Sequence, residues 1–227
     1  MEINKLITKV NFKKVSGKQN KYIVIHYVGA TGGAEANCKY FESTYRGSSA
    51  NYFVGHIGEI WQCVEDKDVA WHCGATTYKH PYCRNDNSIG IEMCCRKRLD
   101  GTWYFEEATV QATIELTKEL MKKYGIPASN VIRHYDVTGK TCPEPYVRDT
   151  AAWNTFKTSL STSAPASGYL VRITANVLNV RKGAGIGYKT TTTVNKGEVY
   201  TIVQEQNGWG KLKSGAGWIS LAYTKRV

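Results

Sequence analysis

Two histidines and one cysteine have the side-chain chemistry of a zinc site. His26 lies in the run IVIHYV, where an imidazole among Ile and Val side chains needs a polar partner. His134 lies in the segment RHYDVTGKTCP, eight residues before Cys142. Imidazole and thiolate both suit Zn²⁺, and three protein ligands with one open position are typical of a catalytic zinc site. The spacing alone leaves a second interpretation open for His26, a core histidine whose partner is a backbone carbonyl.

The chain has seven cysteines, an odd number, and none follows Cys142. A secreted disulfide scaffold has a denser and even set. We therefore interpret the cysteines as free thiols, and all except Cys142 as small buried hydrophobic side chains. An alternative makes Cys38, in an expected helix, the nucleophile of a cysteine endopeptidase. That alternative gives His26 and Cys142 no role.

Strand and helix patterns alternate over residues 1–160. Runs rich in β-branched and aromatic residues predict strands, and apolar residues three and four apart predict helices. The expected strands are residues 21–28, 51–57, 59–64, 87–95 and 130–135. The expected helices are residues 34–46, 105–124 and 149–160. The alternation predicts an α/β domain in which a mixed central sheet carries helices on its faces.

The rest of the chain has a different pattern. The expected elements are all short strands, at residues 169–173, 177–181, 190–194, 199–206, 209–213 and 218–221. Short strands of this kind predict a small all-β barrel. The stretch SLSTSAPASG, which precedes them, has the small, uncharged composition of a linker. We therefore expect domains at residues 1–160 and 168–227, joined by a linker at residues 161–167.

The net charge of +11 is unevenly distributed. Residues 1–160 hold 21 Lys and Arg against 17 Asp and Glu, whereas residues 161–227 hold 9 against 2, a net charge of +7. Such a basic segment indicates an anionic partner. The sequence contains no recognisable nucleic-acid readout module, and no apolar run approaches the ~18 residues that span a bilayer. The N-terminal segment MEINKLITKVNFKK lacks the apolar region of a signal peptide, which predicts synthesis in the cytoplasm.

Five short segments between residues 23 and 143 strengthen the zinc interpretation. In chain order they read IVIHYVG, NYFVGHIGEIWQCV, AWHCG, NSIGIEM and RHYDVTGKTCP. Through these segments residues 1–160 resemble the zinc-dependent N-acetylmuramoyl-L-alanine amidases, the type-2 amidases that include phage endolysins and peptidoglycan recognition proteins. The resemblance implies one Zn²⁺ per chain, held by His26, His134 and Cys142.

The resemblance also implies roles for four further residues. The family's catalytic glutamate falls on Glu92, which would take a proton from water and pass it to the departing amine. Lys140 and Tyr52 would donate to the oxyanion that develops on the lactyl carbonyl, and His72 would line the substrate groove. The alternatives are an outward-facing strand carboxylate for Glu92, a solvated loop cation for Lys140, and structural side chains for Tyr52 and His72.

Residues 168–227 resemble a bacterial SH3-like domain. The resemblance rests on the segments ANVLNVRKGAG, GEVYTIVQEQNGWGKL and GWISLAY, and it implies a module that binds the cell wall. Four aromatic residues, Tyr188, Trp209, Trp218 and Tyr223, either offer stacking surfaces to glycan or peptide or form the core of the barrel.

The two resemblances together imply a peptidoglycan hydrolase that cleaves the amide bond between N-acetylmuramic acid and L-alanine. Its partners would be peptidoglycan and anionic wall polymers, without nucleic acid or stable membrane insertion. Such an enzyme, made in the cytoplasm, would reach the wall of a Gram-positive host through a membrane-permeabilising holin, as a phage endolysin does. The alternatives are a host autolysin of the same activity and a non-catalytic peptidoglycan-binding protein. The non-catalytic proteins lack the ligand cysteine, which is present here as Cys142.

Overall fold

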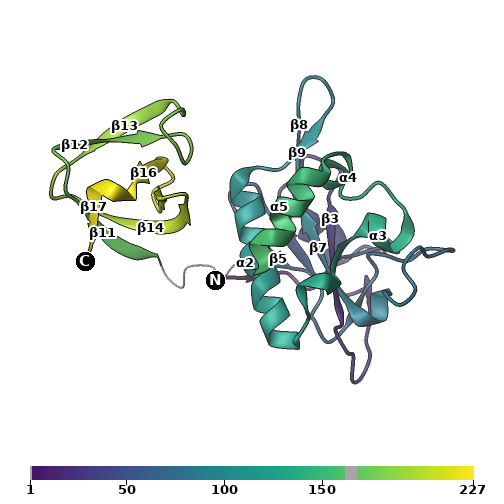
Figure 1. The fold of residues 1–227 in the computed structure, drawn as a ribbon. Coiled ribbons are helices and arrows are strands. Elements are labelled where there is room, and N and C mark those ends of the chain that lie inside the picture. Colours follow the sequence, from purple (N-terminus) through teal and green to yellow (C-terminus); the bar gives the residue numbers. More distant parts are fainter. Residues whose placement is uncertain (1, 162–167) are drawn as a thin grey trace. The chain divides into compact units, whose positions relative to one another are not determined.

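The computed structural model describes residues 2–161 and 168–227. The chain forms two compact units, Met1–Thr162 and Ser163–Val227 (Figure 1). The linker expected at residues 161–167 lies outside the described residues except for Ser161, which ends a helix. None of the helices in the described part of the chain has the length and apolar character of a membrane-spanning segment.

A six-stranded mixed sheet forms the centre of the N-terminal unit (Figure 1). Its strand order is β1-β5-β4-β7-β3-β10, and the run β4, β7, β3 and β10 is parallel. The strands are β1 (Asn4–Lys5), β3 (Tyr22–Tyr27), β4 (Tyr52–Val54), β5 (Ile60–Gln62), β7 (Ser88–Met93) and β10 (Val131–Arg133). Two small ribbons pair β2 (Phe12–Lys13) with β6 (Val69–Ala70), and β8 (Arg96–Lys97) with β9 (Trp103–Tyr104). The five strands expected from the sequence are all present.

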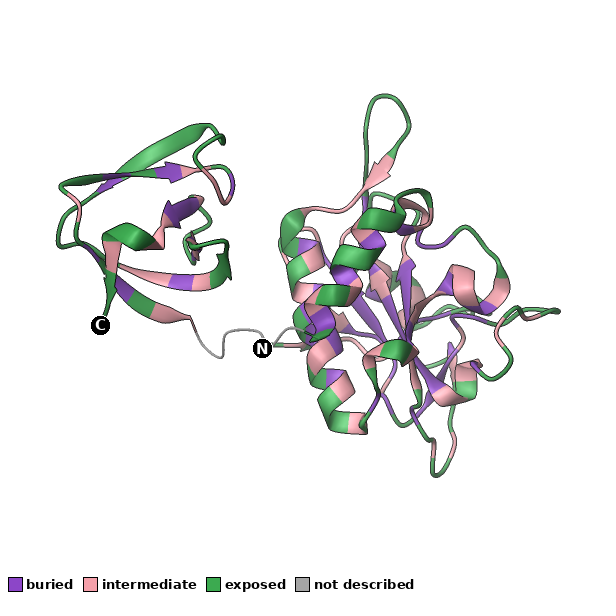
Figure 2. Cartoon of the chain, in the orientation of Figure 1, coloured by how far each residue is buried: buried purple, intermediate pink, exposed green. Residues whose placement is uncertain are grey.

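Helices cover this sheet. They are α1 (Ala34–Glu42), α2 (Glu107–Tyr124), α3 (His134–Thr138), α4 (Glu144–Arg148) and α5 (Thr150–Ser161). The helices α2 and α5 contact each other and lie over one face of the sheet (Figure 1). Leu120 of α2 and Phe156 of α5 belong to one core cluster with Ile25 and Ile91 of the central strands. The strands of this sheet are largely coloured as buried in Figure 2. The predicted α/β architecture is therefore confirmed.

The opposite face of the sheet carries a different set of residues, because neighbours along a strand point to opposite sides. Since Ile25 and Ile91 face α2 and α5, His26 and Glu92 face the other way. The helix α1 covers part of this second face and packs against Phe53 of β4. The sheet thus separates an apolar layer from the layer that holds the polar residues.

The helix α1 ends at Glu42, before the expected limit at residue 46. The amide nitrogen Nδ2 of Asn11 donates hydrogen bonds to the backbone carbonyls of Phe41 and Thr44, each at 2.7 Å. The carbonyls that would continue the helix are therefore bonded to the N-terminal segment.

The C-terminal unit is a seven-stranded antiparallel sheet of order β13-β12-β16-β15-β14-β11-β17. Its strands are β11 (Tyr169–Ile173), β12 (Val177–Arg181), β13 (Thr190–Asn195), β14 (Val199–Gln206), β15 (Trp209–Leu212), β16 (Trp218–Ser220) and β17 (Thr224–Arg226). The sheet curls around its own core, which includes Ile173, Ile202 and Ile219 (Figure 1). The sequence predicted six of these strands and missed β17. The all-β expectation for this part of the chain is confirmed.

Candidate active site

Parallel strands bring His26, His134 and Glu92 to one edge of the sheet. His26 and Glu92 are register partners near the carboxyl ends of β3 and β7, so their side chains leave the same face. His134 follows β10 directly as the first residue of α3. Ligands of open α/β sheets bind at the carboxyl ends of the strands, which is where this group of residues lies.

The helix α3 and the loop after it close the group. A strand was expected to continue to residue 135, but Asp136 caps a helix instead by accepting from the backbone N–H of Arg133 at 2.9 Å. The helix ends at Gly139, whose φ of 86° lies in the left-handed region. The chain then turns back, and the carbonyl of Cys142 accepts from the N–H of Tyr135 at 2.8 Å. This fold-back returns Cys142 to the start of α3.

The three predicted ligands meet at this point. The ligand atoms of His26, His134 and Cys142 all lie within 4.8 Å of one another, and the three residues are buried. Cys142 Sγ is 3.7 Å from His26 Nδ1. A nitrogen and a sulfur at ordinary distances from one tetrahedral Zn²⁺ are ~3.6 Å apart. His134 Nδ1 is buried and has no hydrogen-bond partner among the described residues. The donor set and its spacing therefore fit zinc.

Burial holds both imidazoles in the neutral form that binds metals. The pKa of His26 lies well below its ordinary value because burial disfavours the charged ring, with repulsion from His134 as the next cause. Burial, followed by the charge of Lys140, lowers the pKa of His134 to about 4. Burial also raises the pKa of the Cys142 thiol. A thiol that coordinates a metal ion is deprotonated outright. The positive charge of a bound cation would therefore stabilise the thiolate form of Cys142.

Glu92 lies beside the ligand cluster. Its Oε1 is 3.9 Å from His26 Nδ1, and 20% of its side chain is exposed. Its Oε2 is buried without a hydrogen-bond partner in the described part of the chain. Burial raises the pKa of Glu92 to about 8, and the Lys140 ammonium acts in the opposite direction. A carboxyl group of this kind can take up and return a proton near neutral pH.

Lys140 supplies positive charge to the same site. Its side chain is exposed, and its backbone carbonyl accepts from the N–H of Cys142 at 2.7 Å. Burial is the main influence on the pKa values of Glu92 and Cys142, and the Lys140 ammonium acts against it by lowering both. The ammonium therefore favours the negatively charged forms of both side chains.

The comparison with protein families agrees with this geometry. The family model described as N-acetylmuramoyl-L-alanine amidase matches residues 16–145, more than half of the chain. The chain belongs to this amidase family. A second model, described as bacterial SH3 domain, matches residues 176–225.

Individual relatives of this amidase are known in sequence and in structure. The chain is 37% identical over 149 residues to the amidase CwlL of Bacillus licheniformis, which covers 60% of this chain and 39% of that protein. It is 31% identical over 137 residues to AmiD of Escherichia coli, covering 55% and 48%. The catalytic domain of XlyA superposes with a TM-score of 0.58 at 25% identity and covers 71% of this chain and 100% of that one. A mutant endolysin from Bacillus subtilis gives a TM-score of 0.57 at 26% identity, covering 71% and 99%. The chain spans about two fifths of the length of the first two curated relatives that it matches.

The structure does not bring Tyr52 to the ligand cluster, where the resemblance implies an oxyanion donor. Its hydroxyl donates to Asp66 Oδ1 at 2.7 Å and accepts from Gln62 Nε2 at 3.1 Å. The side chain is 3% exposed and packs in the core on the side of α2. The register partner of Glu92 in β4 is Phe53, so Tyr52 points to the opposite face of the sheet. The structure therefore places Tyr52 in the core, on the face opposite the ligand cluster, as the structural alternative expects.

His72 is only 8% exposed, so little of its ring is open to the groove that the resemblance implies. Its Nδ1 lies 3.1 Å from His26 Nε2, and its Nε2 lies 3.1 Å from Ser88 Oγ. A Cβ on Gly90 would lie 2.5 Å from the His72 ring, so the glycine makes room for that ring. Ser88 and Gly90 were not predicted from the sequence. Ser88 lies four residues before Glu92 and Gly90 lies two residues before it, on the same face of β7, and this spacing is the signal that could have found them.

The seven cysteines are free thiols, as predicted, and all are buried. Cys38 of α1 packs against Cys63 and Phe53. The hydrogen bond with Cys63, followed by burial, raises the pKa of the Cys38 thiol. An activated cysteine nucleophile has a lowered pKa and solvent access. The structure therefore gives no support to the cysteine endopeptidase alternative.

Proposed function

We propose that this chain is a zinc-dependent amidase that cleaves peptidoglycan between the lactyl group of N-acetylmuramic acid and the L-alanine of the stem peptide. The observation that carries the proposal is the buried cluster of His26, His134 and Cys142 beside a free carboxylate oxygen of Glu92. Membership of the amidase family supports the choice of substrate. The cluster argues against a purely peptidoglycan-binding role, since binding alone needs neither a metal site nor a proton acceptor.

The residues of the site divide the reaction between them. His26, His134 and Cys142 each offer one ligand atom to the ion. When bound, Zn²⁺ supplies Lewis-acid chemistry, which polarises a carbonyl and makes water more acidic. Glu92 takes the proton of the attacking water and passes it to the alanine nitrogen, which cannot leave as an anion. The Lys140 ammonium stabilises the negative charge that develops on the carbonyl oxygen.

Mass spectrometry of digested peptidoglycan tests the proposed bond. We expect free muramic lactyl carboxyl groups together with new N-terminal L-alanine residues. New reducing sugar ends would identify a glycosidase instead, and cleaved stem peptides would identify an endopeptidase.

The role of Lys140 predicts a loss of rate without a loss of metal. We expect Lys140→Ala to keep the fold and the zinc content and to lower kcat by ~10²–10³, the cost of one lost oxyanion donor. Turnover of a soluble muropeptide and the zinc content would be measured on the same preparation. Lys122→Ala, which removes an exposed cation from α2, is the matched control and should keep the wild-type rate. A normal rate for Lys140→Ala would exclude the ammonium from the mechanism.

We propose that the enzyme acts on the cell wall after it leaves the cytoplasm in which it is made, as an endolysin released through a holin. The similarity to an endolysin among the solved structures supports this setting. A host autolysin would have the same site chemistry and would differ in its route of export.

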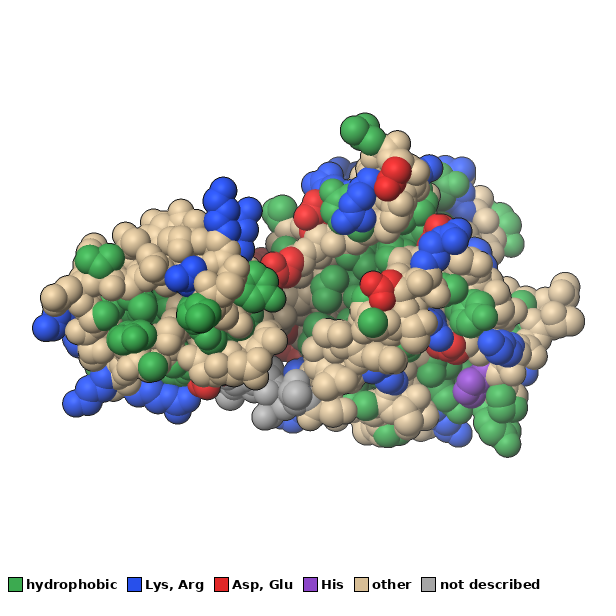
Figure 3. Space-filling view, turned by 45° about the horizontal axis from the view of Figure 1, so that its top comes forward, with side chains coloured by type: hydrophobic (Ala, Val, Ile, Leu, Met, Phe, Trp, Pro, Cys, Tyr) green, Lys and Arg blue, Asp and Glu red, His purple; other side chains and the backbone are tan. Residues whose placement is uncertain are grey.

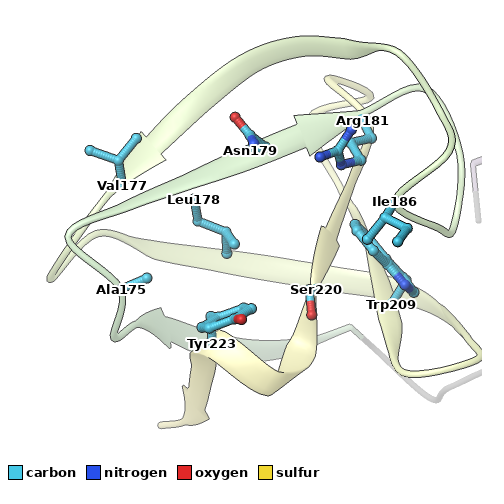
Figure 4. Close-up of a pocket in the computed structure, with 9 residues that line it drawn as sticks. All are labelled: Ala175, Val177, Leu178, Asn179, Arg181, Ile186, Trp209, Ser220 and Tyr223. Carbon is cyan, nitrogen blue, oxygen red and sulfur yellow. The ribbon is translucent and has the colours of Figure 1, made fainter.

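We further propose that residues 168–227 hold the enzyme on the wall, while residues 1–160 carry out catalysis. A cavity of about 310 Å³ opens in the C-terminal unit, and its lining includes Trp209, Tyr223 and Arg181 (Figure 4). Trp209 and Tyr223 are thus the two candidate aromatic residues that line the cavity. The other two candidates do not line it: Trp218 is buried and Tyr188 is exposed. Exposed hydrophobic side chains gather on one face of this unit, with basic side chains around them (Figure 3). Aromatic rings beside a guanidinium suit glycans or peptides that carry anionic groups.

This division of labour predicts that truncation affects only the polymeric substrate. Each unit has its own hydrophobic core, so residues 2–161 should hydrolyse a soluble muropeptide at the rate of the full chain. On whole walls we expect the truncated protein to be slower by ~10²-fold, because tethering raises the local concentration. The loss should be greatest at low salt, since the Debye length falls from ~10 Å at 0.1 M to ~3 Å at 1 M.

Both proteins would be assayed on walls and on the soluble substrate at two salt concentrations. Trp209→Ala in the full chain is the companion variant, and it should weaken wall binding while keeping the soluble rate. The targeting role is wrong if isolated residues 168–227 fail to sediment with walls, or if truncation abolishes soluble turnover.

A further inference from the structure

We propose that His72 is a positioning residue that fixes the tautomer of His26, so that Nδ1 of His26 presents its lone pair to the metal. The proposal rests on the zinc site proposed above. It assigns His72 to the support of a ligand rather than to the substrate, and it adds Ser88 as the anchor of that support.

A chain of hydrogen bonds runs from His26 to a backbone carbonyl, and that carbonyl sets the direction of every bond. The carbonyl of Arg84 can only accept, so the Ser88 hydroxyl donates to it, at 2.6 Å. Ser88 Oγ has then used its one proton and must accept from His72 Nε2, at 3.1 Å. The Cys73 thiol is 4.0 Å from the same oxygen, which is a long contact for a weak donor.

The direction of hydrogen-bond donation also determines which nitrogen of His26 carries the proton. A neutral imidazole carries one N–H, so a proton on His72 Nε2 leaves His72 Nδ1 as an acceptor. Among the described residues, the hydrogen-bond partner of His72 Nδ1 is His26 Nε2, at 3.1 Å, which must therefore carry the proton of His26. The other nitrogen, His26 Nδ1, is left with its lone pair, and it faces Cys142 Sγ at 3.7 Å. The chain thus selects the tautomer in which His26 can bind zinc through Nδ1.

The surroundings of His72 hold its ring in this position. The side-chain oxygen of Asn85 accepts from the backbone N–H groups of His72 and Cys73, at 3.1 and 2.8 Å. Gly90 leaves the space that the ring occupies, because a Cβ there would lie 2.5 Å from the ring. His26 itself is 1% exposed, so no water competes with His72 for Nε2 at the protein surface. Metal-bound histidines generally depend on such a partner for their orientation and basicity.

A pair of variants with side chains of nearly equal size and shape separates this role from simple packing. His72→Asn places a carbonyl oxygen near the position of Nδ1 and can still accept from His26. His72→Leu fills similar space but accepts nothing. We expect His72→Leu to bind zinc 10–100-fold more weakly than the wild type, the usual cost of losing such a partner, and His72→Asn to bind within a few-fold of it. Zinc affinity would be measured on the full chain by competition with a chelating dye, and circular dichroism would check that each variant is folded.

The tautomer is measured directly by nitrogen-15 NMR of the full wild-type chain labelled at histidine, without zinc and with zinc. We expect His26 and His72 to carry their protons on Nε2 before zinc is added, and His26 Nε2 to remain protonated afterwards. A proton on His26 Nδ1 in the zinc-free chain overturns the proposal, and this measurement needs no variant.

The two affinity outcomes also distinguish this proposal from the proposed function. If the wild type binds zinc and His72→Leu binds it equally well, the positioning role is wrong and the zinc site stands. If His72→Asn is as weak as His72→Leu, the ring acts by packing and the proposal is again wrong. If the wild type binds no zinc, the proposed function fails, and the NMR spectrum still reports the tautomer of His26.

Discussion

Glu92→Gln is expected to lower muropeptide turnover by ~10²–10⁴-fold, the usual contribution of a general acid–base residue, while zinc content and fold stay unchanged. The amide has nearly the shape of the carboxylate, but it cannot take a proton from water or deliver one to the leaving nitrogen. Zinc content should stay the same because Glu92 is not among the three clustered ligands. The fold should stay the same because Glu92 Oε2 has no hydrogen-bond partner among the described residues, so the change leaves no partner of that atom unpaired. Rate, zinc content and circular dichroism would be measured on one preparation.

Tyr52→Phe is the matched control for this experiment. Tyr52 and Glu92 lie on neighbouring parallel strands. Tyr52 faces α2, however, and its hydroxyl donates to Asp66 and accepts from Gln62. The variant should keep wild-type turnover and lose about 1–2 kcal/mol of unfolding free energy, because Asp66 loses a buried hydrogen bond. A near-normal rate for Glu92→Gln would exclude Glu92 as the proton carrier. A large loss of rate in stable Tyr52→Phe would show that the tyrosine does reach the reaction.

Much of this site could be predicted because its residues lie on strands that are visible in the sequence. The run around His26 and the run around Glu92 are apolar enough to be central strands, and central strands of an α/β sheet pair in parallel. That pairing places the two residues at one edge, as the register confirms. The five sequence segments that resemble the amidase family identified His134 and Cys142 as zinc ligands. Spacing alone could not connect these two residues with His26.

The positions expected from the sequence for Tyr52 and His72 differ from those in the structure, for a different physical reason in each case. All three residues of β4 are buried, so the strand has no alternation of apolar and polar positions that would show which face carries the site. His72 lies in a loop 46 residues from His26, and only the tertiary structure brings the two rings together. The motif around His72 identified a residue near the site but carried no information on whether its ring faces solvent or the back of a ligand.

The start of α3 shows a third limit. The sequence favoured a strand through residue 135, since β-branched residues continue to Val131 and Ile132 and aromatic Tyr135 follows. The strand ends because the Asp136 carboxylate caps a helix at the backbone of Arg133 and also binds its guanidinium at 2.8 Å. A cap of this kind depends on one side chain and does not change the hydrophobic pattern. It nevertheless decides the direction in which His134 enters the site.

Removal of zinc is expected to abolish activity and to leave a folded protein. Treatment with a chelator should reduce muropeptide turnover to background, and added Zn²⁺ should restore it. The fold should persist, because the main core between the sheet and helices α2 and α5 contains none of His26, His134 and Cys142. Stability should fall, however, since a ligand that binds only the folded state at 100 times its Kd contributes about 2.7 kcal/mol.

Cys142→Ala tests the same site without a chelator. The variant leaves two buried, neutral imidazoles without the thiolate. We therefore expect it to bind less than one Zn²⁺ per chain, to lose activity, and to show no rise in Tm when Zn²⁺ is added. Cys63→Ala is the matched control, because Cys63 is also a fully buried thiol but packs beside Cys38 in a separate cluster. Its Tm should fall by the cost of a small cavity, yet it should bind one Zn²⁺ and gain stability from it as the wild type does. The zinc mechanism fails if metal-free wild-type protein remains fully active, or if Cys142→Ala binds zinc and gains stability to the same extent as Cys63→Ala.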